Sequence, residues 1–359
     1  MHKNRKSLEF FFRRVVMSSK VRILRSNLNS IYANLAVEEA IIAKEAVQPH
    51  LFLWRNEPAV TIGRHQNPWK ECNLNAMDDK GVSLARRYSG GGAVYQDMGC
   101  TTFTFVNGIS ANDSPSRIID SNFDLLVNSL TSLGLSAARK GRNDVVVGEF
   151  KVSGSAFKQI PGRLVHHGTI LVNTDMTRLA SYLTPSKLKL QSKGIASVGA
   201  RVVNLSEINP SINHEIICDS LTKSYSSHYN DTSSVMDIID ESIQSDPVFC
   251  NHHKALKDWN WRYGTTPEFS NLLETRLDQI GCFDVHYQVN DGKISKIRIF
   301  SDCLFPDVIE TIQNSLLGSP YSVSAIRETL NSTRVTNDDD DGKKKSVISE
   351  FSKWFTSEI

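Results

Sequence analysis

This 359-residue chain lacks several features, and each absence narrows the possible classes of protein. No apolar run approaches the ~18 residues that a membrane-spanning helix needs, so the sequence indicates no membrane partner. The six cysteines form no Cys-x-x-Cys pair, which excludes the common zinc and thiol-redox motifs. A net charge of only +2 gives no strong basic field, which argues against a nucleic-acid ligand.

The composition is otherwise that of a globular protein, with 40% hydrophobic and 22% charged residues and enough length for two domains. The first twenty residues differ from the rest, because they carry six basic side chains, one acidic side chain and several phenylalanines. A basic, acid-poor and amphipathic segment is typical of a mitochondrial transit peptide. We therefore interpret residues 1–20 as a targeting extension and expect a location in the mitochondrial matrix, with reduced cysteines. The alternative is a plain extension of a cytoplasmic protein, with translation starting at Met17.

The chain is organised around the stretch from Arg86 to Gly99, in which two arginines precede three consecutive glycines. Glycine can take positive φ and lets a ligand approach the backbone closely, and consecutive backbone N–H groups form an anion-binding concavity. Guanidinium groups bind phosphate or carboxylate through two parallel hydrogen bonds. The pattern predicts a site for an anionic ligand such as a nucleotide phosphate, with a hairpin turn and solvated arginines as the alternative. It is neither a P-loop nor a dinucleotide fingerprint.

Two further groups of residues are candidates for chemistry. Asp144 begins a predicted strand, Gly148 opens a tight turn and Lys151 lies on the returning strand, so the carboxylate and the ammonium group should be close. A carboxylate is a suitable ligand for Mg²⁺, although an aspartate before a strand also caps turns. His166 and His167 are adjacent in a predicted strand, so they point to opposite faces and do not share a metal. A histidine that only packs in the strand is the alternative for His167.

Helical and strand patterns alternate along the chain and predict an α/β domain over residues 21–230. Within it, we expect residues 92–106 to form one strand that holds the glycine-rich loop. Residues 231–255 are rich in Ser, Asp and Asn, a composition that favours a linker. Residues 256–359 would then form a second, smaller α/β unit.

At these motifs the chain resembles the lipoate–protein ligase family. The matching stretches are Arg86 to Tyr95, Gly141 to Asp144, Lys151 to Ala156, His166 to Asn173, Lys193 to Leu205 and Trp259 to Phe269. The resemblance implies an α/β fold in which a mixed sheet flanked by helices, similar to that of biotin–protein ligases, precedes a smaller α/β C-terminal domain. The chain departs from the family at Gln96 and Cys100, where the family usually has His and Asn.

The resemblance also implies an activity with its cofactors. Lipoate and MgATP give lipoyl-AMP and pyrophosphate, and the lipoyl group then passes to a lysine of a lipoyl carrier domain. The family's lysine that contacts the lipoyl carboxyl group and the α-phosphate falls on Lys151, where an ammonium would stabilise the charge gathering at phosphorus. Asp144 would then bind Mg²⁺. The expected nucleotide-binding residues are Arg87, Gly90, Gly91, Gly92, Ala93, Val94 and Tyr95 with Lys151, and the expected lipoate pocket consists of Arg86, Ser89, His167 and Gly168.

The implied partners are the lipoyl domains of 2-oxoacid dehydrogenase complexes and the glycine cleavage H protein, and we expect a monomer. Three other activities stay open. A lipoyltransferase uses preformed lipoyl-AMP and shares every motif named above. An octanoyltransferase works through a cysteine thioester, for which Cys100 is the candidate. A non-catalytic lipoate-binding protein is the third, although the retention of Lys151 and both arginines argues against it.

Overall fold

The computed structural model describes residues 21–43, 48–110, 112–183, 202–231, 236–263, 271–335 and 341–359. The predicted targeting segment and most of the family-like stretch from Lys193 to Leu205 lie outside these ranges. Within them, no helix is both long enough and apolar enough to cross a membrane.

The first domain is built on an eight-stranded mixed sheet with the strand order β11-β1-β2-β6-β10-β9-β8-β7. The strands β11, β1 and β2 run parallel to one another, and the remaining neighbours are antiparallel. Their bounds are β1 (Arg22–Ser26), β2 (His50–Trp54), β6 (Cys100–Gly108), β7 (Ala137–Lys140), β8 (Asp144–Val147), β9 (Phe150–Ile160), β10 (Arg163–Leu171) and β11 (Met236–Ile239).

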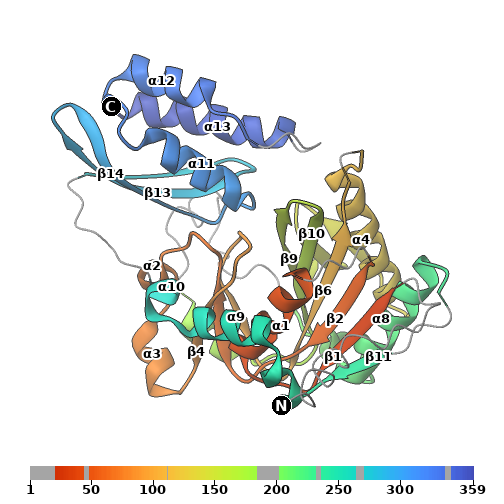
Figure 1. Cartoon of the computed structure of the whole chain (residues 1–359). Helices are drawn as coiled ribbons and strands as arrows, with labels where there is room; N and C mark the ends of the chain where they lie inside the picture. The colour runs from red at the N-terminus through yellow and green to blue at the C-terminus, as the bar shows by residue number, and fades with distance from the viewer. Residues whose placement is uncertain are drawn as a thin grey trace, which may run out of the picture.

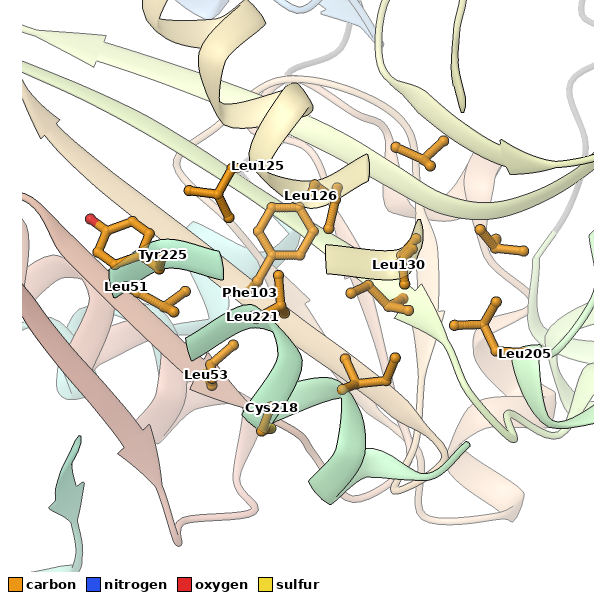
Figure 2. Packing of buried hydrophobic residues seen from close by; sticks show 14 of the residues in the cluster. Leu51, Leu53, Phe103, Leu125, Leu126, Leu130, Leu205, Cys218, Leu221 and Tyr225 are labelled. Carbon is orange, nitrogen blue, oxygen red and sulfur yellow. The ribbon is translucent and has the colours of Figure 1, made fainter. Parts of the chain in front are cut away.

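Helices cover both faces of this sheet (Figure 1). On one face lie α4 (Pro115–Thr131) and α8 (His214–His228), and on the other lie α1 (Ile31–Ala43) and α9 (Pro247–Lys257). Figure 2 shows Leu126 of α4 and Leu221 of α8 beside Phe103 of the central strand β6. The central strands β2 and β6 are buried on both faces, and β6 fills its buried positions with threonines as well as phenylalanines.

The segment predicted to be a linker belongs to this first domain, so the predicted domain boundary is wrong. The strand β11 pairs with β1, and α9 buries Phe249 and Leu256 against α1. The polar residues that suggested a linker include helix caps, because Asp240 and Asp246 accept hydrogen bonds from the first backbone N–H groups of the helices that follow them. Helix α10 (Trp259–Tyr263) also packs on the first domain.

A small sheet with the order β4-β3-β5 carries the glycine-rich loop. It consists of β3 (Ala59–Ile62), β4 (Ser83–Arg86) and β5 (Val94–Gln96), and the short helices α2 (Pro68–Glu71), α3 (Leu74–Asp79), α5 (Met176–Tyr182) and α7 (Leu205–Ile208) complete the domain. The single strand predicted over residues 92–106 is two strands, β5 and β6, in different sheets. The chain turns between them, where the Asp97 carboxylate accepts the Gly99 N–H at 2.9 Å.

The C-terminal domain has its own core. Three antiparallel strands, β12 (Asn271–Leu277), β13 (Gly281–Asn290) and β14 (Lys293–Ser301), are covered on one face by α11 (Pro306–Leu316), α12 (Val323–Ser332) and α13 (Asp341–Ser357) (Figure 1). Phe283, Ile299 and Phe351 lie buried between sheet and helices. The predicted fold class, a mixed sheet flanked by helices with a smaller α/β domain, is confirmed.

Candidate active site

The glycine-rich loop connects β4 to β5 and is organised around the buried guanidinium of Arg87. This group donates to the carbonyl oxygens of Thr61 (3.1 Å), Gly90 (2.6 Å) and Gly92 (2.8 Å), and its Nε–H donates to Ser89 Oγ (3.0 Å). Burial lowers the pKa of Arg87 to about 10, so the group stays cationic at neutral pH. Arg87 therefore fixes the conformation of the loop from its buried side.

Two of the three glycines are tightly enclosed and the third is open. Gly91 has φ of +87°, and a Cβ on Gly90 would lie 2.3 Å from the carbonyl oxygen of Cys303. A Cβ on Gly92 would meet no atom within 4 Å and needs no unusual φ. The space in front of Gly92 is thus the part of the loop that is accessible to a ligand.

The guanidinium of Arg86 does not offer its N–H donors to the expected lipoate pocket. Its Nε–H and Nη–H groups donate to backbone carbonyls of two segments, which are those of Gly63, Arg64 and Gln66 in one and of Trp261 and Arg262 in the other. In return, the indole N–H of Trp261 donates to the Arg86 carbonyl at 2.8 Å. The structure therefore corrects the expected role of Arg86, which clamps the loop after β3 to helix α10.

Lys151 and Asp144, which were predicted to lie a short hairpin apart, form an ion pair. The two residues face each other across the β8–β9 hairpin, with Lys151 Nζ 2.6 Å from Asp144 Oδ1, and each side chain keeps about a third of its surface exposed. A Cβ added to Gly154 would lie 3.0 Å from that Nζ. Ala156, two residues further along the same face of β9, is the neighbour of Gly91. The glycine-rich loop and the ammonium group therefore share one face of the sheet.

The adjacent histidines point to opposite faces, as the strand pattern predicts. His166 lies among phenylalanine rings, and neither ring nitrogen has a hydrogen-bond partner in the described part of the chain. Burial, with repulsion from His167 and Arg139, holds the pKa of His166 well below its usual value. His167 lies on the site face, where its Nε2 is 2.6 Å from Ser89 Oγ.

Glu38 of α1 completes this group, and the sequence-based analysis missed it. Its carboxylate lies 2.8 Å from His167 Nδ1 and accepts a 2.7 Å hydrogen bond from Thr104 Oγ1. Burial alone would raise the pKa of Glu38, but electrostatic attraction to His167, with hydrogen bonds from His167 and Thr104, more than offsets it, so the pKa is lowered. The signal in the sequence was a pair of glutamates inside the otherwise apolar helix Ile31–Ala43.

The two positions that depart from the family are both buried. Gln96 accepts hydrogen bonds from Asn56 and Thr61 and donates to Thr102 at 3.0 Å, so its amide joins β3, β5 and β6. Burial raises the pKa of the Cys100 thiol to about 12. A thiol that is 1% exposed and almost never ionised is a poor nucleophile. This arrangement argues against an octanoyltransferase that uses Cys100.

The C-terminal domain touches the glycine-rich loop. The Gly91 N–H donates to the Cys303 carbonyl at 3.3 Å, and the Ser301 N–H donates to the His65 carbonyl at 2.7 Å. Arg64 forms an ion pair with Glu310 of α11. The two domains therefore meet at the site itself.

The fold and this site define a class of acyl-transferring protein ligases, and the family models agree. The model described as the lipoyl protein ligase A/B catalytic domain matches residues 30–226, and the one described as the bacterial lipoate protein ligase C-terminus matches residues 266–355. The chain belongs to the lipoate–protein ligase family and is an enzyme of this type.

Curated relatives extend over nearly the whole chain. The lipoate-protein ligase A of Bdellovibrio bacteriovorus is 41% identical over 348 residues, which cover 95% of this chain and 99% of that protein. The lipoate-protein ligase A of Psychrobacter cryohalolentis is 39% identical over 346 residues, with the same coverage. Both relatives are bacterial. The predicted mitochondrial location is therefore wrong, and the bacterial relatives fit the cytoplasmic alternative.

Solved structures show the same relationship. P. falciparum LipL1 in complex with lipoate is 35% identical, with a TM-score of 0.79 over 94% of this chain and 99% of that one. A lipoate-protein ligase A bound with ATP is 28% identical, with a TM-score of 0.58 over 68% of this chain and 99% of that one. A bi-partite lipoate protein ligase from Thermoplasma acidophilum, described with its E2 lipoyl domain, is 28% identical, with a TM-score of 0.61 over 70% and 100%.

Proposed function

We propose that this ligase carries out both half-reactions, using MgATP to form lipoyl-AMP and then transferring the lipoyl group to a lysine of a lipoyl domain. The observation that carries the proposal is the position of Lys151. Its ammonium is held by Asp144 at 2.6 Å on the same face of β9 that the glycine-rich loop approaches. ATP-bound and lipoate-bound relatives support the choice of ligands.

Lys151 acts in the first half-reaction by stabilising charge. The lipoate carboxylate attacks the α-phosphorus of ATP, so negative charge gathers between the carboxyl group and the phosphate. A fixed ammonium at that point stabilises the transition state more than the separated reactants. The open face of Gly92 lets a phosphate approach the loop backbone, while Arg87 holds the loop from behind.

Asp144 is the protein ligand that we propose for Mg²⁺. The described residues contain no group of three or more His, Cys, Asp or Glu side chains that could hold a metal ion. Mg²⁺ commonly binds through one or two carboxylates together with substrate phosphates and water. One carboxylate beside the proposed phosphate position fits that pattern, and the ion would neutralise phosphate charge there.

In the second half-reaction, the amine of the acceptor lysine attacks the carbonyl carbon of the mixed anhydride and AMP leaves. The amine must be neutral to attack, so this step slows as the pH falls. We propose lipoyl domains of 2-oxoacid dehydrogenases and the glycine cleavage H protein as acceptors; the archaeal ligase described with an E2 lipoyl domain supports this class. A transferase restricted to preformed lipoyl-AMP is the second candidate, because Gln96 stands where the family usually has His.

The test is pyrophosphate release from purified protein with lipoate and MgATP, without an acceptor, combined with mass detection of lipoyl-AMP. We expect lipoate-dependent release from the wild type and about 100-fold slower release from Lys151→Met. Lys223→Met, which removes an exposed lysine from α8 on the other face of the sheet, is the matched control and should retain the wild-type rate. No release from the wild type, with lipoyl transfer from added lipoyl-AMP, would identify the transferase instead.

A second variant tests the glycine-rich loop as the ligand site. Gly92→Ala places a methyl group in open space, so the free energy of unfolding should change by less than about 1 kcal/mol. The affinity for ATP should nevertheless fall, because the methyl group points into the space proposed for the phosphate. Unchanged ATP affinity in a normally folded Gly92→Ala protein would refute this placement.

A further inference from the structure

A continuous chain of hydrogen bonds leads from helix α1 to the glycine-rich loop. Glu38 contacts His167 Nδ1 at 2.8 Å, His167 Nε2 contacts Ser89 Oγ at 2.6 Å, and Ser89 Oγ accepts from Arg87 Nε at 3.0 Å. Arg87 then donates to the carbonyls of Gly90 and Gly92. Glu38, Ser89, Arg87 and His167 are all at most 6% exposed. Three elements that are distant in sequence are thus joined by one buried polar path.

The chemistry of the two ends gives this path a direction. A guanidinium can only donate, so Ser89 Oγ accepts from Arg87. An ionised carboxylate can only accept, so His167 donates its Nδ1–H to Glu38, which also accepts from Thr104. An imidazole that carries its one N–H on Nδ1 accepts at Nε2, so the Ser89 hydroxyl donates its hydrogen to His167 Nε2. Every hydrogen bond therefore points from the loop toward Glu38.

We propose that Glu38 is a positioning residue for the ligase reaction. It holds His167 with Nδ1 protonated and Nε2 accepting, and this orientation fixes Ser89 and, through it, the guanidinium that shapes the glycine-rich loop. The proposal rests on the proposed function only in assigning the nucleotide to that loop. Glu38 itself acts at a distance, since two side chains separate it from Arg87.

The neighbouring Glu39 provides a matched control within the same helix. It is also buried, at 6% exposure, and its carboxylate binds Lys158 of β9 at 2.7 Å. Lys158 reaches the loop only through a cation–π contact with the ring of Tyr88, so the described residues show no chain of hydrogen bonds from Glu39 to Arg87. Equal substitutions at positions 38 and 39 therefore each remove a buried carboxylate that accepts hydrogen bonds, and only those at position 38 interrupt the chain of hydrogen bonds to the loop.

The experiment compares Glu38→Gln, Glu38→Met, Glu39→Gln and Glu39→Met. Glutamine keeps an oxygen that can accept from His167, whereas methionine keeps only the size. We expect kcat/KM for pyrophosphate release to fall about 100-fold in Glu38→Met and no more than about tenfold in Glu38→Gln, because loss of orientation at a distance has effects of this size. The Glu39 variants should stay within about threefold of wild type at temperatures where all four are folded.

Two readouts do not depend on turnover. The ¹⁵N shifts of the His167 ring should show Nδ1 protonated and Nε2 accepting in the wild type and Glu39→Met, and lose this pattern in Glu38→Met. ATP affinity measured by calorimetry without lipoate should weaken about tenfold in Glu38→Met alone.

Two results would overturn the positioning role of Glu38. Parallel losses at positions 38 and 39 that follow the melting temperature would overturn the proposal, because both glutamates would then only stabilise the fold. A wild-type His167 protonated on Nε2 would also overturn it, whatever the activity. If the wild type releases no pyrophosphate, the proposed function fails, while the ring shifts and the ATP affinity still decide the role of Glu38.

Discussion

Replacing His166 by leucine should make the protein less sensitive to acid, and the size of the effect follows from the burial of the imidazole. His166 is fully buried against Phe103, Phe105, Phe123 and Phe157, without a hydrogen-bond partner for either ring nitrogen in the described residues. Leucine is similar in size, has no polar atom and cannot bind a proton. The substitution therefore removes both an unsatisfied polar group and a titrating one.

The sign comes from comparing proton binding in the two states. Above the ordinary histidine pKa of 6.5, the folded and unfolded chains both carry neutral His166, and pH has no effect through this residue. Below 6.5 the unfolded chain binds a proton that the folded chain excludes, since burial holds the folded pKa well below that value. The wild type therefore loses about 1.4 kcal/mol of unfolding free energy per pH unit, which amounts to about 2 kcal/mol at pH 5.

At pH 8 His166 is neutral in both states, so the difference in unfolding free energy between the variant and the wild type depends only on packing and hydrogen bonding. Removing an unsatisfied buried group gains about 1–3 kcal/mol, and losing the ring contacts costs about 0.5–1.5 kcal/mol. The net change at pH 8 should therefore lie between about −0.5 and about +2.5 kcal/mol, where a positive value favours leucine. The difference between the variants should then grow by about 2 kcal/mol on going from pH 8 to pH 5.

The assay is urea unfolding of wild type and His166→Leu at pH 8, 6.5, 5.5 and 5. Burial also lowers the pKa values of His65 to about 3 and of His214 to about 4, but both residues are present in both proteins and cancel in the difference. Replacement of the buried Phe52 by leucine serves as the control, because it removes no titrating group, and should give a pH-independent difference. A difference that stays constant between pH 8 and pH 5 for His166→Leu would refute the reasoning.

Three further predictions concern packing around the site. In Gly168→Ala, the new Cβ would lie 2.7 Å from the Gly154 carbonyl and 2.7 Å from the Phe103 ring, so urea unfolding should show a loss of about 1–3 kcal/mol; a loss below 0.5 would contradict this. Gly90→Ala would place Cβ 2.3 Å from the Cys303 carbonyl and so push the C-terminal domain away from the loop. The Ser301 N–H, which donates to the His65 carbonyl of the first domain, should then exchange its hydrogen with solvent faster. Gly92→Ala, which places Cβ in open space, should leave this exchange rate unchanged. Trp261→Phe would leave the Arg86 carbonyl without its indole donor and cost about 1–3 kcal/mol, whereas the exposed Trp259→Phe should cost less than about 0.5.

Local patterns predicted the strongest elements well. The two strands predicted on either side of the Gly148 turn are present. This feature depends on neighbours in sequence, because Gly148 has the positive φ of 61° that such a tight turn favours. The boundary of the first domain was wrong because pairing of β11 with β1 joins residues more than 200 positions apart, which no local composition reveals.

In the site, too, local relations were predicted from the sequence and long-range contacts were not. Residue types and their spacing predicted that Lys151 and Asp144 would meet across a short hairpin, and that His166 and His167 would face opposite ways, because both relations follow from strand geometry. The roles of the two arginines could not be predicted from the sequence, because a buried guanidinium donates to whichever backbone carbonyls the fold brings near it. Arg86 donates to the carbonyl of Trp261, 175 positions along the chain, whereas Arg87 donates to the carbonyl of Gly90 within its own loop.

The sequence by itself therefore determined the class of chemistry, through a glycine-rich loop, two cations beside it and a lysine paired with an aspartate on the next hairpin. Tertiary structure alone decided which of these groups face a ligand and which hold the others in place. It packed α1 against β10 and so brought Glu38 to His167, 129 positions along the chain. It also placed Cys303 on the loop and buried Cys100 out of reach. Burial and long-range pairing are properties of the whole fold, so no single stretch of sequence specifies them.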